Sequence, residues 1–223
     1  MGFYRGPNIV TDGLVFAIDA GSARSYPGSG TAVTNLSGTN NVTLANGVGF
    51  GSNNGGVFTY DGVDDQGNSG TWFNYQAFTI NLWVEPGSTQ VQYADIIDNN
   101  HTGGQNWVCQ QDSTSQNVYS FGVFGSGATS VTGNFTLTAG DWVNLTFTYD
   151  GTRVRGYNNG VLFATGAALG TTINYSSQNF YIGRWAGGGR NWEGEYGPMY
   201  VYTRALNAAE ILQNYNAQKS RFI

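Results

Sequence analysis

The chain has 223 residues, a formal net charge of -5 and only 10% charged residues, with 34 glycines and one cysteine. This length suits one large domain with a single core, and one cysteine excludes an intrachain disulfide framework. The nine basic residues are scattered, which excludes the clustered positive surface that binds nucleic acid. No stretch approaches the roughly 18 apolar residues of a membrane span, and the first residues lack the apolar segment of a secretory signal. We therefore expect no nucleic-acid or membrane partner, and synthesis in the cytoplasm without an export signal.

In the first half of the chain, short apolar stretches alternate with turn residues. Residues 13–19 follow a turn and predict a buried strand, and residues 57–60 predict a second strand that ends at an Asp-Gly turn. Residues 78–84 alternate apolar and polar side chains, which predicts a strand with one face on a core. Residues 20–56 are rich in Gly, Ser, Asn and Thr and predict short strands within long loops.

The second half repeats this pattern and ends in the one segment of helical composition. Residues 142–149, 153–157 and 161–164 are separated by Asp-Gly and Asn-Gly turns, which predicts a three-strand meander. Residues 205–217 predict a helix, with Asn207 and Glu210 at the spacing of a capping box. About a dozen short strands with one short helix indicate an all-β antiparallel sandwich.

Several of these segments resemble one known family. Residues 13–21, 60–65, 78–84 and 141–151, followed by the closing strands and terminal helix, are similar to the laminin-G-like jelly rolls of the concanavalin A-like lectin/glucanase superfamily. The opening and the ending of the chain are similar to virion proteins of tailed phages, notably marine ones. The resemblance implies a two-sheet antiparallel jelly roll with one short C-terminal helix, and a location in a virion.

The two ends of the chain fall outside the strand pattern. We expect an N-terminal arm over residues 1–12, a jelly-roll domain over 13–217 and a C-terminal tail over 218–223. Both ends carry aromatic residues and arginine, the residue types enriched at the centres of protein interfaces. The expected docking residues are Phe3, Tyr4, Arg221 and Phe222. The alternative is that both ends pack against the sandwich.

Three carboxylates gather within a short turn at Asp61, Asp64 and Asp65. This spacing can supply hard oxygen ligands to Ca²⁺, so these residues are a candidate calcium site. Asp side chains in turns also accept local backbone hydrogen bonds, and this structural interpretation is the stronger of the two.

An aromatic loop near the end of the chain is a candidate carbohydrate site. Trp185, Trp192 and Tyr196 can present ring faces to a sugar, and Arg190 can donate hydrogen bonds to it. The alternative is that these aromatic side chains cover the end of the sandwich, which is the commoner role of aromatics in such a fold. Trp72, Phe73 and Tyr75 require the same caution.

The chain has few carboxylates that suit catalysis. Glu193 and Glu195 lie two residues apart, within the loose range of a glycosidase pair, but no third acid follows them. We therefore expect no catalytic residue and no enzymatic activity.

Two function classes follow from these observations. The first is a non-enzymatic virion structural protein, either a capsid decoration or a component of a tail or fibre. It would dock on other virion proteins and form a homo-oligomer or a lattice. The alternative is a carbohydrate-binding adhesin that recognises glycans on the host surface.

Overall fold

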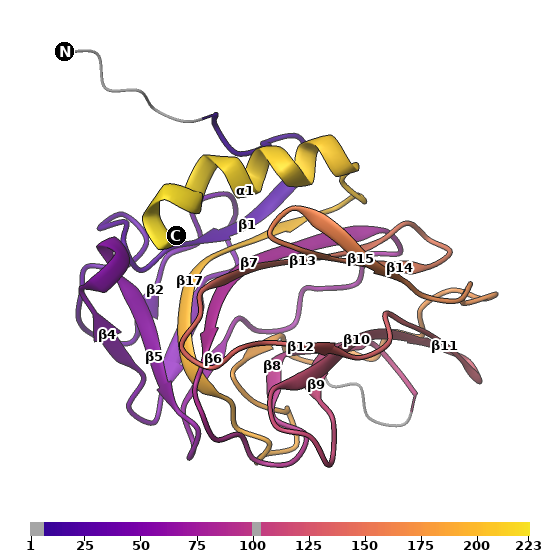
Figure 1. Cartoon of the computed structure of the whole chain (residues 1–223), viewed down its shortest axis with the longest axis horizontal. Helices are drawn as coiled ribbons and strands as arrows, with labels where there is room; N and C mark the ends of the chain where they lie inside the picture. The colour runs from indigo at the N-terminus through magenta and orange to yellow at the C-terminus, as the bar shows by residue number, and fades with distance from the viewer. Residues whose placement is uncertain (1–6, 100–103) are drawn as a thin grey trace.

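The computed structural model describes residues 7–99 and 104–223, which form two antiparallel β-sheets packed face to face (Figure 1). One α-helix, α1 (Ala208–Phe222), lies on the outside of the sandwich. The predicted all-β jelly roll with a C-terminal helix is confirmed. No helix in the described part of the chain is long and apolar enough to cross a membrane.

The first sheet, here called sheet A, has β7 and β17 at its centre. In spatial order its strands are β15 (Val161–Thr165), β14 (Val154–Asn158), β13 (Val143–Tyr149), β7 (Phe78–Pro86), β17 (Glu193–Tyr202), β5 (Val57–Asp61) and β4 (Gly49–Gly51), with β1 (Leu14–Ile18) also paired to β17. The ten-residue strand β17 pairs with β7 along its length, with β5 at its start and with β1 at its end.

The second sheet, here called sheet B, consists of shorter strands. Its order is β11 (Ala128–Val131), β10 (Val118–Gly125), β9 (Trp107–Gln111), β8 (Asp95–Asp98), β16 (Tyr181–Ile182), β6 (Gln66–Asn68), β3 (Val42–Ala45) and β2 (Ala32–Val33), with β12 (Phe135–Thr136) paired to β10. A short 3₁₀ turn, η1 (Asn53–Gly55), links β4 and β5. Residues 20–56 thus form short strands within loops, as their composition predicts.

The core lies between the inner faces of the two sheets. Alternation along the strands turns every second side chain inward, and the following inward side chains are at most 3% exposed: Phe16, Ile18, Leu82, Val84, Leu145, Phe147, Ile182 and Val201. Phe121 of sheet B stacks on Phe147 of sheet A with ring centroids 4.5 Å apart. Cys109 is a buried free thiol within this core, so the fold does not rest on a disulfide.

The predicted meander is confirmed as β13, β14 and β15. The turn between β14 and β15 places Asn159 at φ 50° and Gly160 at φ 80°. Both residues therefore occupy the left-handed region, which Asn and Gly tolerate better than other residues and which a tight hairpin requires.

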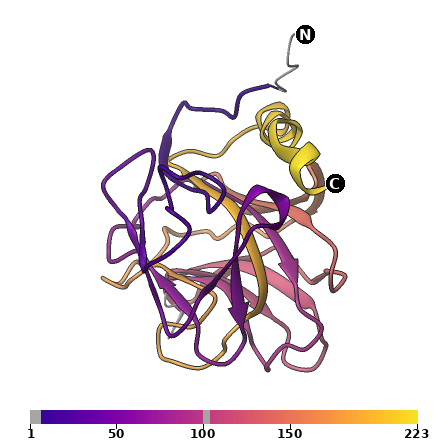
Figure 2. The same cartoon turned by 90° about the vertical axis from the view of Figure 1, so that its left-hand side faces the viewer.

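Helix α1 covers the outer face of sheet A (Figure 2). Asn207 caps its start, since its side chain accepts hydrogen bonds from the Ala209 and Glu210 N–H groups while Glu210 bonds back to the Asn207 N–H. The predicted capping box is confirmed. In the middle of the helix, Asn214 is buried and donates to the Tyr202 hydroxyl at 3.0 Å.

The C-terminal tail predicted over residues 218–223 is wrong, because the helix continues through Phe222. The Phe222 ring is 9% exposed and stacks on Trp83 of β7 at 4.5 Å, with Trp142 at 4.6 Å. Gly197 makes room for this ring, since a Cβ there would lie 2.7 Å from it. Arg221 forms an ion pair with Asp19 at 2.8 Å. Arg221 and Phe222 are therefore wrong as free docking residues, because both are engaged with the sandwich.

The described part of the N-terminal arm also contacts the helix. The Val10 N–H donates to Asn214 Oδ1 at 2.8 Å, and the Tyr202 hydroxyl donates to the Val10 carbonyl at 3.0 Å. Val10 is therefore buried beneath the helix rather than part of a free arm. The predicted docking residues Phe3 and Tyr4 lie outside the described residues.

The packing of the helix end can be tested with a matched pair of substitutions. Phe222→Ala removes a buried ring from two tryptophans, and we expect it to lower the free energy of unfolding by roughly 3 kcal/mol in urea denaturation. Ile223→Ala changes a side chain that is 62% exposed, and we expect a change below about 0.5 kcal/mol. If the two variants unfolded at the same urea concentration, the packing of Phe222 on sheet A would be contradicted.

Candidate functional site

Two of the four residues predicted to contact carbohydrate lie in the core. Trp192 is fully buried and its Nε1 donates to the Tyr119 hydroxyl at 3.0 Å. Tyr196 is 2% exposed and its hydroxyl donates to the Ile96 carbonyl at 2.6 Å. Both residues are wrong as sugar contacts, because Tyr196 of β17 and Trp192 immediately before this strand point into the core. The alternative interpretation, in which aromatics fill the sandwich, is confirmed for this pair.

Trp185 and Arg190 lie on the loop between β16 and β17, and both are half-buried. The Arg190 guanidinium lies over the Trp185 ring at 4.5 Å and over the Tyr93 ring at 5.1 Å. Gly187 lies against the six-membered ring of Trp185, since a Cβ there would come within 2.5 Å of it. These contacts occupy the Trp185 ring within the loop, and a sugar contact at Trp185 and Arg190 stays a prediction.

Beneath this loop, β8 carries two fully buried carboxylates, Asp95 and Asp98. Asp98 Oδ2 accepts a hydrogen bond from the Ala186 N–H at 3.0 Å, and Asp95 Oδ1 accepts one from Gln110 Nε2 at 2.9 Å. Asp95 Oδ2 has no hydrogen-bond partner among the described residues. Burial, and then repulsion from Asp98, raise the pKa of the Asp95 carboxyl well above its usual value. The sequence gives no sign of this buried acidic pair, because Asp-Ile-Ile-Asp resembles the other short strands of the chain.

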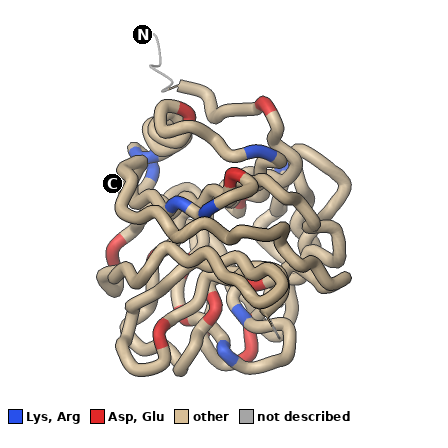
Figure 3. Tube along the Cα trace, turned by 90° about the vertical axis from the view of Figure 1, so that its right-hand side faces the viewer, with Lys and Arg blue, Asp and Glu red and all other residues tan. Residues whose placement is uncertain are grey.

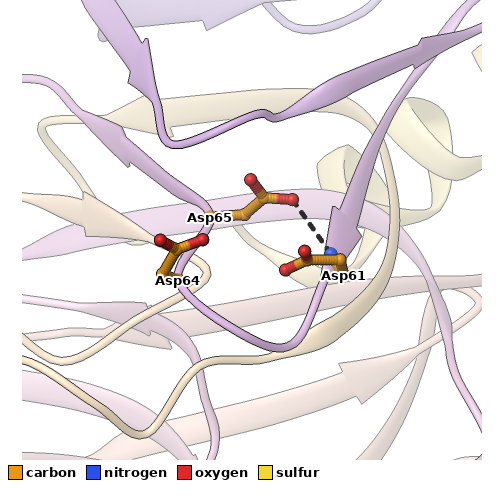
Figure 4. A group of neighbouring side chains, drawn as sticks. All are labelled: Asp61, Asp64 and Asp65. Atoms are coloured by element: carbon orange, nitrogen blue, oxygen red, sulfur yellow. Dashed lines mark hydrogen bonds between the residues drawn. The ribbon is translucent and has the colours of Figure 1, made fainter.

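The candidate calcium ligands do come together in space (Figure 4). One oxygen from each of Asp61, Asp64 and Asp65 lies within 4.8 Å of the others. The Asp61 N–H donates to Asp65 Oδ2 at 3.0 Å, and Asp61 Oδ1 accepts from the Val63 N–H at 2.8 Å. These bonds confirm the turn-stabilising role. Carboxylate oxygens this close also fit Ca²⁺, so calcium binding stays a prediction.

The environment of Asp65 differs from that of its two neighbours. Asp65 is 3% exposed, whereas Asp61 and Asp64 are exposed. Burial raises the pKa of the Asp65 carboxyl, the hydrogen bond from the Asp61 N–H opposes this, and the charges of Asp61 and Asp64 raise it further.

The glutamates considered for catalysis lie at the start of β17 and accept hydrogen bonds from neighbouring connecting segments. Glu193 Oε2 accepts from the Thr89 N–H at 3.1 Å, and Glu195 Oε2 accepts from Asn53 Nδ2 at 2.8 Å. Glu85 of β7 lies opposite Glu195, so a third acid absent from the local sequence is supplied by the neighbouring strand. Burial, and then Glu195, raise the pKa of the Glu85 carboxyl.

The outer face of sheet B carries a row of polar residues. Cross-strand pairing aligns Thr43 of β3 with Asn68 of β6, and Asn68 with Tyr181 of β16. Their neighbours in sequence, such as Leu44 and Ile182, are buried in the core, so this row faces away from it.

Part of this row borders an open cleft of about 490 Å³, here called the amide cleft. Its lining consists of Asn41, Thr43, Ala45, Gln66, Asn68, Ser69, Gly70 and Asn179. Four of the eight lining residues carry amides and two carry hydroxyls. Charged side chains are absent from this lining.

A second cleft of about 270 Å³, here called the aromatic cleft, opens beside the first. It is lined by Thr71, Trp72, Phe73, Asn74, Tyr175, Ser176 and Ser177. One face of Trp72 stacks on Phe16 at 5.5 Å, and its Nε1 donates to Ser69 Oγ at 2.9 Å. The Tyr175 hydroxyl donates to the Tyr75 carbonyl at 2.7 Å. Of the aromatics noted in the sequence, Trp72 thus both packs on the core and borders a cleft.

The two clefts share one wall. Ser69 and Gly70 border the amide cleft, and the next residues, Thr71 and Trp72, border the aromatic cleft. The Thr71 hydroxyl donates to Asn179 Oδ1 across the boundary at 2.7 Å. The amide cleft has no local signature in the sequence, because its residues come from three distant segments, 41–45, 66–70 and 179, that each look like ordinary turns or edges. The one usable signal was the alternation of Val42, Thr43 and Leu44.

The pKa of Asp95 leads to a pH-dependent prediction. The pKa of Asp95 is higher in the folded protein than in the unfolded chain. The free energy of unfolding therefore falls as the pH rises from the ordinary pKa of Asp through the raised pKa of the folded state. Asp95→Asn removes this loss while its amide oxygen keeps the Gln110 bond, so we expect a higher Tm than the wild type at about pH 7. The difference should vanish towards about pH 3.

Asp112→Asn is the control with the opposite sign. Hydrogen bonds from the Thr114 N–H and hydroxyl lower the pKa of the Asp112 carboxyl, so its stabilisation is present above the ordinary Asp value and lost in acid. We expect this variant to melt below the wild type at neutral pH. The measurement is the Tm of each variant relative to the wild type across the pH range. If both variants melted above the wild type, or both below it, at neutral pH, these pKa shifts would be contradicted.

Calcium binding can be tested without disturbing the turn. If Ca²⁺ binds, about 1 mM of it should raise the Tm of the wild type by mass action, and a chelator should reverse the gain. Asp64 is exposed and its carboxylate makes no hydrogen bond to any described residue. Asp64→Asn should therefore abolish the calcium effect while leaving the Tm in chelator unchanged. An unchanged wild-type Tm at this concentration would leave only the turn-stabilising role.

Comparison with known proteins agrees with this fold. Residues 37–212 match the family Laminin_G_3, described as the concanavalin A-like lectin/glucanases superfamily. No curated protein sequence matches the chain.

Three solved structures illustrate the likeness. Domain 4 of AbnA, a GH43 extracellular arabinanase from Geobacillus stearothermophilus in complex with arabinotriose, has a TM-score of 0.69 and 14% identity, over 91% of this chain and 98% of that chain. The binding domain of botulinum neurotoxin DC in complex with SialylT has a TM-score of 0.71 and 17% identity, over 93% and 52%. Trypanosoma rangeli sialidase in complex with sialic acid has a TM-score of 0.72 and 17% identity, over 97% and 35%.

This chain thus spans about half of the neurotoxin chain and about a third of the sialidase chain. At such identities the likeness to these structures is one of fold alone. The family match, by contrast, covers most of the sequence. The chain belongs to the concanavalin A-like lectin/glucanase superfamily.

Proposed function

We propose that this domain is a non-catalytic carbohydrate-binding domain. The observation that carries the proposal is the pair of adjoining clefts, which combine aromatic, amide and hydroxyl side chains. Sugar rings have apolar C–H faces that pack on aromatic rings and hydroxyl rims that exchange hydrogen bonds with amides. A cleft with both kinds of side chain therefore suits a glycan.

The fold neighbours support the same proposal. Domain 4 of AbnA was solved with arabinotriose and the Trypanosoma rangeli sialidase with sialic acid. Sugar ligands thus recur among proteins that share this architecture, although fold by itself does not define function.

The absence of catalysis is part of the proposal. Glycoside hydrolysis commonly uses two carboxyl groups on either side of the scissile bond. Neither cleft is lined by a carboxylate, and Asp95 and Asp98 are fully buried beneath the 183–192 loop. Glu193 and Glu195 lie on sheet A, outside both clefts. The cleft chemistry therefore favours binding without turnover.

The role in a phage virion, with docking on other virion proteins and a homo-oligomer or lattice, stays a prediction. A glycan-binding adhesin on a virion would unite both function classes. One apolar surface that could make protein contacts lies at β15, where Val161 is 68% and Leu162 49% exposed, whereas Phe222 near the end of the helix is buried. Acidic and basic positions are interspersed in the view of Figure 3.

The proposed function is tested by screening the intact domain against immobilised neutral and sialylated oligosaccharides, followed by calorimetry with the best ligands. We expect saturable binding of at least one glycan class, and no shortened sugar products after prolonged incubation. Sugar release that Glu195→Gln abolished would overturn the non-catalytic assignment. Lack of binding to every glycan in the panel would overturn the function itself.

A further inference from the structure

We infer that the amide cleft and the aromatic cleft form one site for a neutral oligosaccharide, with one sugar ring against Trp72 and the next sugar held by amide N–H donors. This inference rests on the proposed function and adds to it the location of the site, the class of glycan and the role of each cleft.

The amide cleft has a feature that its composition alone does not reveal. Each of its four amide side chains has its oxygen engaged by another group of the protein. The bonds run to Asn41 Oδ1 from the Asn35 N–H (2.9 Å), to Gln66 Oε1 from Arg184 Nη1 (2.8 Å), to Asn68 Oδ1 from the Gly70 N–H (2.8 Å) and to Asn179 Oδ1 from the Thr71 hydroxyl (2.7 Å).

These bonds orient the amides. With each oxygen bound to the protein, the four NH₂ groups remain as donors, and none of them donates to another described residue. Donors held in place before binding lose little conformational entropy when a ligand arrives. The cleft therefore suits a ligand whose oxygens accept several hydrogen bonds at once, such as the ring, hydroxyl and acetamido oxygens of a sugar.

The aromatic cleft offers a complementary surface. Trp72 is fixed on one face by Phe16 and at its Nε1 by Ser69, and it borders the cleft while remaining partly exposed. Tyr175 is fixed by its bond to the Tyr75 carbonyl. A rigid, partly exposed indole suits the apolar face of a sugar ring.

The shared wall connects the two clefts into one site. Thr71 and Asn179 are joined across the boundary, so the last amide donor lies next to the first residue of the aromatic cleft. Together the clefts enclose about 490 and 270 Å³, which is room for more than one sugar unit. Two adjoining subsites of different character suit an oligosaccharide rather than a single sugar.

The charge of the site favours a neutral ligand. No side chain in either lining is charged, and the protein has a formal net charge of -5. Arg184 contacts the lining residue Gln66 from outside the cleft, and its Nη1 and Nε already donate to Gln66 and to the Trp185 carbonyl. Strong recognition of a sugar carboxylate commonly uses an arginine that can face it directly. We therefore expect neutral glycans to bind better than sialylated ones.

The decisive variants are near-isosteric. Asn68→Asp and Asn179→Asp keep the oxygen that accepts from Gly70 or Thr71 but replace the outward NH₂ donor with a carboxylate oxygen. Asn207→Asp is the matched control, because it makes the same charge change at the helix cap, where Asp is equally favourable. Trp72→Ala tests the aromatic subsite, and Trp185→Ala tests the alternative loop.

The measurement is calorimetry of each variant with the neutral trisaccharide that binds the wild type most tightly in the panel, and with its monosaccharide. We expect Asn68→Asp and Asn179→Asp each to weaken binding about tenfold or more, while Asn207→Asp and Trp185→Ala bind as the wild type. The monosaccharide should bind the wild type at least about tenfold more weakly than the trisaccharide. Thermal melting checks that each variant is folded.

The outcomes separate this inference from the proposed function. If glycans bind but both Asn→Asp variants bind as tightly as the wild type, or if Trp185→Ala alone abolishes binding, the location is wrong while the function stands. If only sialylated glycans bind, the neutral class is wrong. If no glycan binds, the proposed function fails first.

Discussion

The stacking of Phe222 on Trp83 decides which surfaces of this sandwich remain free. The two rings, 4.5 Å apart, fix the end of helix α1 to the outer face of sheet A. The buried bond between Asn214 and Tyr202 fixes its middle, and the ion pair between Arg221 and Asp19 adds a charged contact at its end. The inner face of sheet A consequently packs on the core and part of its outer face lies under the helix, while the edge strand β15 stays exposed. Sheet B keeps an outer face towards solvent, and both candidate clefts open there or at its rim.

The same arrangement explains the polar residues of the two sheets. Asn81 and Thr146 alternate outward from the core in sheet A, yet both are fully buried and hydrogen-bonded to each other beneath the helix. The outward polar residues of sheet B, such as Thr43 and Asn68, instead remain accessible. Similar alternation thus produces a buried polar network on one sheet and a candidate binding surface on the other. The presence of the helix makes the difference.

The low charge content of the chain leaves amides and hydroxyls as the main polar groups of its surface. A surface of amides and hydroxyls needs its hydrogen bonds satisfied by neighbours or by water. In the amide cleft, neighbouring residues donate hydrogen bonds to the four amide oxygens, and the amide NH₂ groups remain as donors. The cleft therefore presents hydrogen-bond donors to a ligand. The acidic turn at Asp61 to Asp65 shows the converse, since two of its carboxylates are already occupied by backbone N–H groups.

Local patterns in the sequence determined the elements whose causes are local. Alternation placed the inward core residues, the Asn-Gly pair set the turn before β15, and Asn207 with Glu210 set the start of the helix, because each depends on residues within a few positions. The tertiary structure decided three other features: where the helix ends, that Trp192 and Tyr196 are buried, and that Glu85 lies opposite Glu195. Each depends on a partner far along the chain: Trp83 for Phe222, Tyr119 for Trp192, and β17 for Glu85. The amide cleft belongs to this second group, since residues between Asn41 and Asn179 meet only when β3, β6 and β16 pair, and no local pattern records that pairing.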